Sequence, residues 1–306
     1  MDPDVEGGVS RDPRPVVAGV DGSAHSAQAA QYAALLAQER NTTLELCCGY
    51  QSPLYGFGPW LGADRLAGGQ EASRYGAEQA LAAVAAQISA AHPALEIQTR
   101  LLAGAGASVL IEQSRRAQIV AVGSRGAGGF EGLLLGSVAA QVAAHAHTTV
   151  IVVRLREPDG GAGTASLLPG PVLVGYDGSA TALAALAFAA QEAALRRTKL
   201  IMLNVHSPAT WGYGEEPDMN SEELSRRESE QMLAKAVTPW ADILDIELRA
   251  VLSLNAERVL LDASADVALT VVGSRGHGGF AGMLLGSASH ALVVHGKGTV
   301  AVVHQR

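Results

Sequence analysis

Cysteine and aromatic residues are scarce in this chain of 306 residues, which has two cysteines and 4% aromatic residues. The two cysteines are the neighbours Cys47 and Cys48. Adjacent residues of a strand point to opposite faces, so a disulfide between them would be strained. No second Cys or Cys/His pair stands at ligand spacing, which argues against a zinc site. The cysteine usage indicates a reducing compartment, and we expect the cytoplasm.

The sequence also lacks a basic block and a long apolar run. Its formal net charge of -8 argues against sequence-independent attraction to nucleic acid or to an anionic membrane. The most apolar stretch, residues 183–195, is interrupted by Gln191 and Glu192, so no membrane-spanning helix is expected. Residues 1–14 are rich in Gly, Pro and charge without an apolar core, which predicts a mobile tail rather than a signal peptide.

Two segments of the chain occur twice. Residues 16–23 recur as residues 172–179, and residues 123–137 (GSRGAGGFEGLLLGS) recur as residues 273–287 with 12 of 15 positions identical. The length is about twice that of a typical domain. We therefore predict two copies of one domain, residues 15–156 and 171–306, joined by a linker rich in Gly, Pro and Ala at residues 157–170.

Strand and helix patterns alternate in each copy. The strands are predicted at 15–20, 43–50, 95–102, 119–122 and 149–153, and in the second copy at 171–176, 199–206, 243–252, 269–272 and 299–303. Ser23 and Ser179 stand where they would cap the first helix of each copy. The alternation predicts an α/β fold of two tandem, open, five-stranded parallel sheets that are doubly wound and Rossmann-like. In such sheets ligands bind beyond the carboxyl ends of the strands, where both repeated motifs begin.

The longer repeat has the spacing G-x2-G-x9-G-S after a strand. It comprises Gly123, Gly126, Gly136 and Ser137, and again Gly273, Gly276, Gly286 and Ser287. Glycine lets the backbone approach a ligand closely, and free amides at a following helix N-terminus attract phosphate oxygens. A plain turn is the other interpretation, but the duplication of the motif, including Arg125 and Arg275, favours a phosphate site.

Two better-known phosphate loops are excluded. Residues 296–299 resemble the end of a P-loop, yet Ala291 occupies the position of its leading glycine. The G-x-G-x-x-G dinucleotide fingerprint fails because its final positions hold Glu131 and Ala281. The sequence therefore supports neither P-loop hydrolysis nor nicotinamide chemistry.

Asp21 and Asp177 end the first strand of each copy. A carboxylate there can accept a hydrogen bond from a ribose hydroxyl or an adenine amino group, and a local Asp-Gly turn is the alternative. A carboxylate does not favour bare phosphate, so Mg²⁺ would be expected to mediate any approach of phosphate to it.

With these motifs, the chain resembles a tandem-type universal stress protein, a family whose ATP-binding members carry the G-x2-G-x9-G-(S/T) signature and an Asp after the first strand. The resemblance implies that the aspartates contact adenosine, that the glycine motif holds phosphates, and that Gly49 and Val205 lie near the adenine. The candidate cofactor-binding residues are Asp21, Gly49, Gly123, Arg125, Gly126, Gly136, Ser137 and Val138, and in the second copy Asp177, Val205, Gly273, Arg275, Gly276, His277, Gly286, Ser287 and Ala288.

Three functional hypotheses remain open at this stage. The first is a stress or growth regulator whose ATP occupancy sets its conformation or partners, and the second is an ATP-using enzyme such as a slow ATPase or nucleotidyl transferase. The third is a structural dimer module. No general base or nucleophile is evident beside the glycine motif, which disfavours the enzyme.

The last strand of each copy is apolar and would form an open sheet edge. We predict that residues 149–153 and 299–303 pack against each other about a pseudo-twofold axis, with the two ATP sites facing away from that seam. Whole chains are expected to pair further into a homodimer.

Overall fold

The computed structural model describes residues 12–51, 63–127, 134–154, 170–207, 219–277 and 284–305, with the backbone alone for 63–70 and 219. The predicted tail up to residue 11 and the predicted linker up to residue 169 lie outside these ranges. The centre of each glycine motif lies outside them as well.

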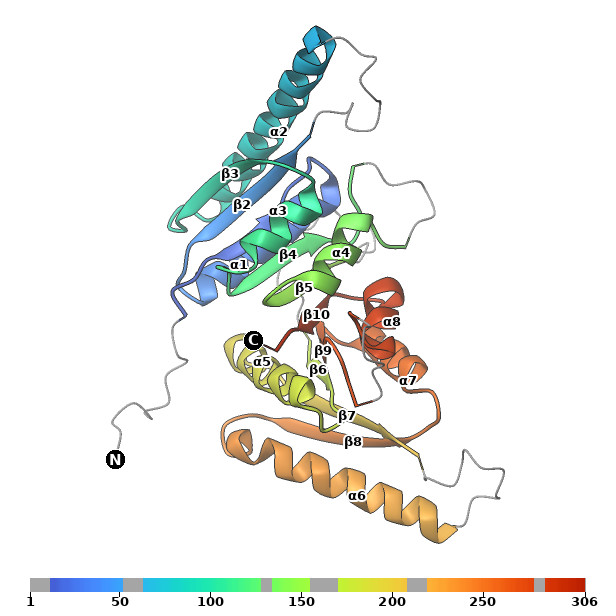
Figure 1. The fold of residues 1–306 in the computed structure, drawn as a ribbon. Helices are drawn as coiled ribbons and strands as arrows, with labels where there is room; N and C mark the ends of the chain where they lie inside the picture. Colours follow the sequence, from blue (N-terminus) through green and yellow to red (C-terminus); the bar gives the residue numbers. More distant parts are fainter. Residues whose placement is uncertain are drawn as a thin grey trace.

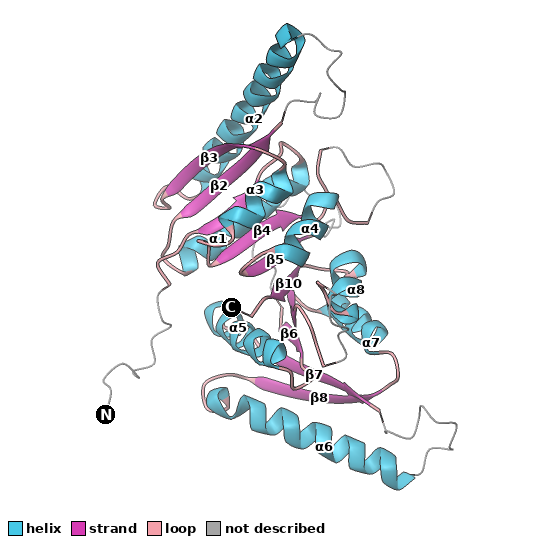
Figure 2. Ribbon diagram, viewed as in Figure 1, coloured by secondary structure: helices cyan, strands magenta, loops and turns pink. Residues whose placement is uncertain are grey.

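Strands and helices alternate through both repeats, which we call half one (residues 12–154) and half two (residues 170–305) (Figures 1 and 2). Half one comprises β1 (Val16–Gly19), α1 (Ala24–Glu39), β2 (Leu44–Tyr50), α2 (Ala63–Ala91), β3 (Ile97–Ala103), α3 (Gly106–Gln113), β4 (Ile119–Gly123), α4 (Ser137–His145) and β5 (Thr149–Val153). Half two comprises β6 (Val172–Gly175), α5 (Ala180–Arg196), β7 (Leu200–His206), α6 (Met219–Val237), the 3-10 turn η2 (Thr238–Trp240), β8 (Ile246–Leu252), α7 (Ala256–Ala263), the turn η3 (Ser264–Asp266), β9 (Leu269–Gly273), α8 (Ser287–His295) and β10 (Val300–Val303).

All the described strands form one ten-stranded sheet in the order β3-β2-β1-β4-β5-β10-β9-β6-β7-β8. Pairing is parallel within each half, and β5 pairs with β10 in antiparallel fashion, with Ile151 opposite Ala301. The predicted fold and the predicted pairing of the last strands are both confirmed. The strand order is symmetric about the β5/β10 seam, which places the pseudo-twofold axis there. Because the seam is antiparallel, the carboxyl ends of the strands in the two halves point in opposite directions.

Helices cover both faces of the sheet, so the parallel strands are buried on two sides (Figure 2). One apolar core lies under α1, α2, α5 and α6, and a second lies under α3, α4, α7 and α8. Cys48 belongs to the first core and Cys47 to the second, and both thiols are free. The two neighbouring cysteines therefore point to opposite faces, as predicted.

The third strand of half two begins later than the sequence pattern indicates. Residues 243–245 precede β8 instead of extending it, because the chain turns through η2 and the Ile243 amide donates to the Trp240 carbonyl at 3.1 Å. Ile243 is 72% exposed, so its apolar side chain does not mark a buried strand position.

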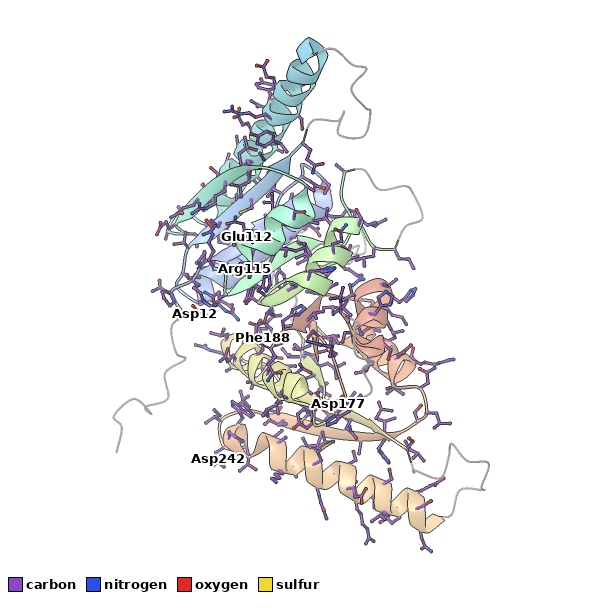
Figure 3. The ribbon with its side chains drawn as sticks, viewed as in Figure 1. Asp12, Glu112, Arg115, Asp177, Phe188 and Asp242 are labelled. Atoms are coloured by element: carbon purple, nitrogen blue, oxygen red, sulfur yellow. The ribbon has the colours of Figure 1, made fainter. Side chains whose placement is uncertain are left out.

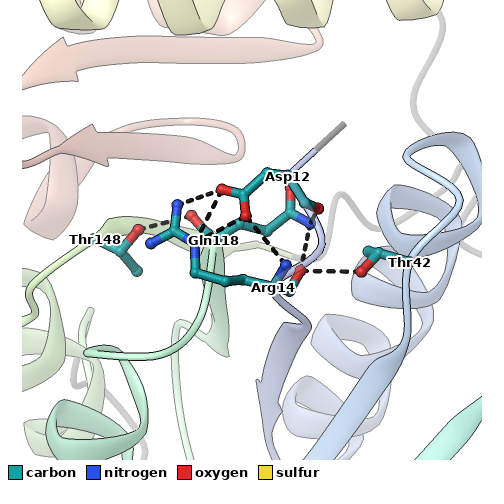
Figure 4. A network of polar contacts seen from close by, with 5 residues as sticks. All are labelled: Asp12, Arg14, Thr42, Gln118 and Thr148. Carbon is teal, nitrogen blue, oxygen red and sulfur yellow. Dashed lines mark hydrogen bonds and ion pairs between the residues drawn. The ribbon is translucent and has the colours of Figure 1, made fainter. Parts of the chain in front are cut away.

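Polar contacts join the segment before β1 to the residues that precede the neighbouring strands (Figure 4). The Arg14 carbonyl accepts hydrogen bonds from the Thr42 hydroxyl at 3.0 Å and from the Gln118 side chain at 2.6 Å. The Thr148 hydroxyl donates to the Gln118 carbonyl at 2.7 Å. These contacts fix the starts of β1, β2, β4 and β5 relative to one another. None of the helices that the structure describes has the length and apolarity needed to cross a bilayer.

Candidate functional site

Each half contains a cavity where its first and fourth strands end. The cavity of half one has a volume of about 400 Å³ and that of half two about 470 Å³, both within the range of small-molecule sites. β1 lies between β2 and β4, and β6 lies between β7 and β9, so each cavity sits where the strand order reverses. Half one alone lines the first cavity and half two alone the second.

The residues around the two cavities correspond closely. Half one contributes Gly19, Val20, Asp21, Ser26, Cys47, Gly49, Gly106, Leu110, Val122, Gly123, Arg125, Gly126, Ala127, Gly136, Ser137, Val138 and Ala139. Half two contributes Gly175, Tyr176, Asp177, Ala182, Leu203, Asn204, Val205, Ala256, Leu260, Val272, Gly273, Arg275, Gly276, Gly286, Ser287, Ala288 and Ser289. Every predicted site residue except His277 therefore lies at a cavity.

The N-terminus of α4 opens onto the first cavity without a side-chain cap. Its N-cap residue is Gly136, which has no side chain, and Ser137 and Val138 form the first helical positions. α8 begins in the same way after Gly286. The first amides of a helix have no partner within the helix, so these two termini present free donors and the positive end of a helix dipole. By contrast, Ser23 caps α1 by accepting from the Ser26 amide at 3.1 Å. The capping serines Ser23 and Ser179 were predicted correctly.

Two glycines of each motif are required by close contacts. A Cβ at Gly123 would lie 2.7 Å from the His25 carbonyl carbon, so this glycine allows the first turn of α1 to approach the end of β4. A Cβ at Gly126 would lie 2.5 Å from Asp21 Oδ2. In half two, Gly273 and Gly276 have the same relations to Thr181 and Asp177.

Asp21 joins the end of β1 to the glycine motif (the corresponding Asp177 is labelled in Figure 3). Its Oδ1 accepts from the Ser23 amide at 3.0 Å and the Ser23 hydroxyl at 2.6 Å, and its Oδ2 accepts from the Ala127 amide at 2.9 Å. Burial by itself would raise the pKa of Asp21, but the hydrogen bonds from Ser23 and Ala127 outweigh it, so the pKa lies below the ordinary value. The local turn considered for this residue is present, and it extends to the glycine motif.

Asp177 repeats this arrangement in half two. Its Oδ1 accepts from the Ser179 amide and its Oδ2 from the His277 amide, both at 3.0 Å. The His277 ring lies beside Asp177, with Nδ1 3.7 Å from Oδ2, and its side chain is 67% exposed. The ring does not line the cavity, so the structure gives no cavity contact for this predicted residue. Burial would raise the pKa of Asp177, and the hydrogen bonds from Ser179 and His277 reverse the shift and lower it.

Arg125 brings positive charge to the side of the first cavity that the glycine motif lines. Its Nε donates to His25 Nε2 at 3.2 Å. Burial and the Arg125 charge lower the pKa of His25, which favours the neutral imidazole that can accept this hydrogen bond. In half two Thr181 replaces His25, and its hydroxyl donates to the Arg275 carbonyl.

The inner walls of the cavities are apolar and differ between the halves. Gly49 and Gly106 in half one correspond to Val205 and Ala256 in half two. The sequence predicts the short helices α3 and α7, as residues 108–116 and 256–264, and it indicates Gly49 and Val205 as site residues. It did not assign Leu110 of α3 or Leu260 of α7 to the site. The signal for these two leucines was present, since both helices follow the third strand of a copy and must begin at the same edge of the sheet.

A doubly wound parallel sheet with an uncapped helix N-terminus at its switch point defines an α/β protein whose sheet edge suits an anion. The chain belongs to the universal stress protein family, because the sequence profile of that family matches residues 13–154 and again residues 170–304. The tandem arrangement predicted from the repeats is thereby confirmed.

Relatives of the same length support this assignment. A universal stress protein of Mycobacterium tuberculosis is 34% identical over 307 residues, covering 94% of each chain. One of Mycolicibacterium smegmatis is 33% identical over 297 residues, covering 95% of this chain and 97% of the relative. Among solved structures, a universal stress protein of Archaeoglobus fulgidus superposes with a TM-score of 0.66 at 21% identity, covering 96% of this chain and 97% of that one. This last likeness concerns the fold.

Proposed function

We propose that each half binds one ATP molecule and that nucleotide occupancy sets the conformation or partners of a stress or growth regulator. The observation that supports this proposal most strongly is the uncapped N-terminus of α4 and of α8 at a cavity with one arginine and an apolar inner wall. Phosphates suit the free amides and the arginine, and a purine suits the apolar wall. The G-x2-G-x9-G-S spacing is that of the ATP-binding members of the family.

In this arrangement the triphosphate lies against the first turn of α4, with Ser137 adding a hydroxyl donor and Arg125 a cation. The adenine lies toward Gly49, Gly106 and Leu110, where the wall has few polar atoms. Asp21 stands between these two regions and faces the ribose. In half two the same roles fall to Ser287, Arg275, Val205 and Asp177, which line the second cavity.

Magnesium would arrive with the phosphates of the nucleotide. The Asp21 oxygens already accept three hydrogen bonds from the protein, which leaves little capacity for direct metal ligation. Within the described part of the chain there is no group of three or more His, Cys, Asp or Glu side chains that could hold a metal ion. The residues therefore fit a nucleotide-borne Mg²⁺ whose charge is balanced mainly by phosphate oxygens.

The test is the nucleotide content of the full-length chain. Gently purified protein, denatured and analysed by mass spectrometry, is expected to release ATP at up to two molecules per chain. Gly126→Glu and Gly276→Glu should each remove one of them with the circular dichroism spectrum unchanged, because the added carboxylate occupies phosphate space and repels it. Unchanged stoichiometry in both variants would remove the glycine motifs from the site. Released ADP with rapid turnover would favour the enzyme instead, and failure of the purified chain to bind added ATP would favour a structural module.

A further inference from the structure

Five side chains from α1, its C-cap residue and α5 form a largely buried group across the seam, which we call the seam cluster: Tyr32, Arg40, Phe188, Glu192 and Arg196. Glu192 is fully buried at its centre. Its Oε1 pairs with Arg40 of half one, and its Oε2 pairs with Arg196 of half two at 2.8 Å. Arg196 also donates to the Tyr32 hydroxyl at 2.5 Å. One carboxylate thus joins a guanidinium from each half.

Four members of the cluster obey the pseudo-twofold symmetry. Arg40 and Arg196 occupy equivalent positions 156 residues apart, as do Tyr32 and Phe188. Each arginine lies over the aromatic ring of the other half, Arg40 at 6.0 Å from the Phe188 centroid and Arg196 at 5.6 Å from that of Tyr32. Figure 3 labels Phe188 on the side of α5 that faces half one.

The fifth member breaks the symmetry. The position of Glu192 corresponds to Leu36 in half one, and both side chains are fully buried. The Arg40 and Arg196 side chains are only 9% and 5% exposed, and the Nη1 atom of each is buried without a hydrogen-bond partner among the described groups. Two buried guanidinium groups therefore share a single carboxylate that only half two supplies.

We propose that Glu192 selects the partner of half one: the seam surface of half one fits half two, from its own or another chain, and rejects a second copy of half one. Two copies of half one would bring together two Arg40 guanidiniums and two Leu36 side chains without the carboxylate that pairs with Arg40, since Glu39 interacts with Arg40 but forms no ion pair with it among the described residues. An uncompensated buried charge is strongly destabilising, whereas the backbone donors and acceptors of a β5 edge also match those of another β5 edge. The charge in the cluster therefore supplies a discrimination that the backbone pairing of the strands lacks.

The first experiment moves the carboxylate across the pseudo-twofold axis in the full-length chain. Glu192→Leu should lower the Tm by roughly 10 °C, because two buried arginines lose their shared partner. Adding Leu36→Glu should restore more than half of that loss, since residue 36 is placed to reach Arg40 one turn along α1 and Arg196 across the seam. Glu78→Leu removes an exposed pair with Arg74 at the same i,i+4 spacing and should change the Tm by less than about 2 °C. An unchanged Tm for Glu192→Leu, or a double variant whose Tm is no higher than that of Glu192→Leu alone, would overturn the proposal.

The second experiment reports which halves pair. Residues 151 and 301 face each other and are equivalent in the repeat, so two copies of half one would place residue 151 opposite itself. Ile151→Cys chains are refolded from urea at high concentration and then oxidised. Burial raises the pKa of the Cys47 thiol to about 12 and that of Cys48 to about 11, so these thiols stay unreactive in the folded chain.

Disulfide-linked dimers should be rare for Ile151→Cys alone. They should increase at least about fivefold when Leu36→Glu is added, because half one then carries a carboxylate for each Arg40. Equal yields with and without Leu36→Glu would show that the carboxylate does not select the partner.

Discussion

At the scale of single residues, Asp21 and Asp177 fix the position of the loop that begins each glycine motif. Each carboxylate holds the backbone amide that follows the second glycine of the motif, so the side of the cavity that the glycine motif lines is fixed to the end of the first strand. The close approach of the carboxylate leaves no room for a side chain at Gly126 or Gly276. These glycines are therefore needed for a hydrogen bond as well as for access of a ligand.

Gly126→Ala is expected to weaken ATP binding to half one about tenfold (~1.4 kcal/mol), since its Cβ would displace the Asp21 carboxylate from the Ala127 amide. Gly76→Ala on α2 is the matched control, because a Cβ there meets nothing within 4 Å and improves helix propensity. Titration calorimetry of both variants measures the effect. Equal affinities for the two would mean that this hydrogen bond does not shape the site.

The aspartates also predict how stability depends on pH. Their folded-state pKa values are lowered, so the stability they contribute is complete above the ordinary value of 3.8 and is lost as the pH falls through the lower folded-state values. The Tm of the chain should therefore fall steeply below about pH 4. The double variant Asp21→Asn with Asp177→Asn should show a smaller fall between pH 7 and pH 3, and Asp262→Asn at an exposed position should behave like the original chain. A double variant that loses as many degrees as the original would contradict this assignment.

At the scale of elements, the site depends on how closely the first turn of α1 approaches the end of β4. Gly123 permits that approach, and Gly273 permits it between α5 and β9. Gly123 thus allows two elements to pack closely, while Gly126, three residues later, shapes the cavity. Substitutions at these two positions can separate the two roles.

Gly123→Ala should destabilise the chain by about 1–3 kcal/mol, because its Cβ would overlap the backbone of His25 and push α1 away from the sheet. Gly126→Ala, whose clash is with the Asp21 side chain at the cavity, should cost less, about 0.5–1 kcal/mol, because only the hydrogen bond to the Ala127 amide is lost. Urea unfolding at pH 7 compares the two. If Gly126→Ala proves the more destabilising variant, the division of roles between these glycines is wrong.

The element order was predictable from the sequence because buried strands and amphipathic helices differ in length and period. The ends of the strands and helices were less predictable. The apolar Ile243 indicated a longer β8, but the turn at η2 determines where this strand begins. Glycine spacing located both cavities, since motifs after parallel strands meet at one edge. It could not distinguish glycines that contact a ligand from those that allow packing, because that depends on which backbone lies opposite.

At the scale of the whole molecule, the seam turns two five-stranded sheets into one. The apolar β5 and β10 sequences predicted this pairing, since an open apolar edge needs a partner. The seam cluster was not predicted, because it requires knowledge of which helix faces meet across the axis. A signal was present in Glu192, the one charged residue of the stretch 183–195, which is apolar apart from Glu192 and Gln191.

Amide hydrogen exchange should show this continuity directly. The amides of β5 and β10 lie in the middle of the ten-stranded sheet and should exchange as slowly as those of β1 and β6. Those of the outer strands β3 and β8 should exchange at least about tenfold faster. Fast exchange confined to β5 and β10 would show that the halves separate in solution, which the paired seam does not allow.

The outer strands themselves have a consequence for how the protein behaves when crowded. β3 and β8 lie at the two ends of the sheet in Figure 1, and each carries charged side chains, Arg100 on β3 and Glu247 and Arg249 on β8. A further strand docking on either edge would have to strip water from these ions. The duplication has paired the two apolar edge strands, β5 and β10, with each other and has left the charged strands β3 and β8 outermost. The molecule therefore ends its own sheet with two charged edges, although strand pairing of the same kind extends a fibril.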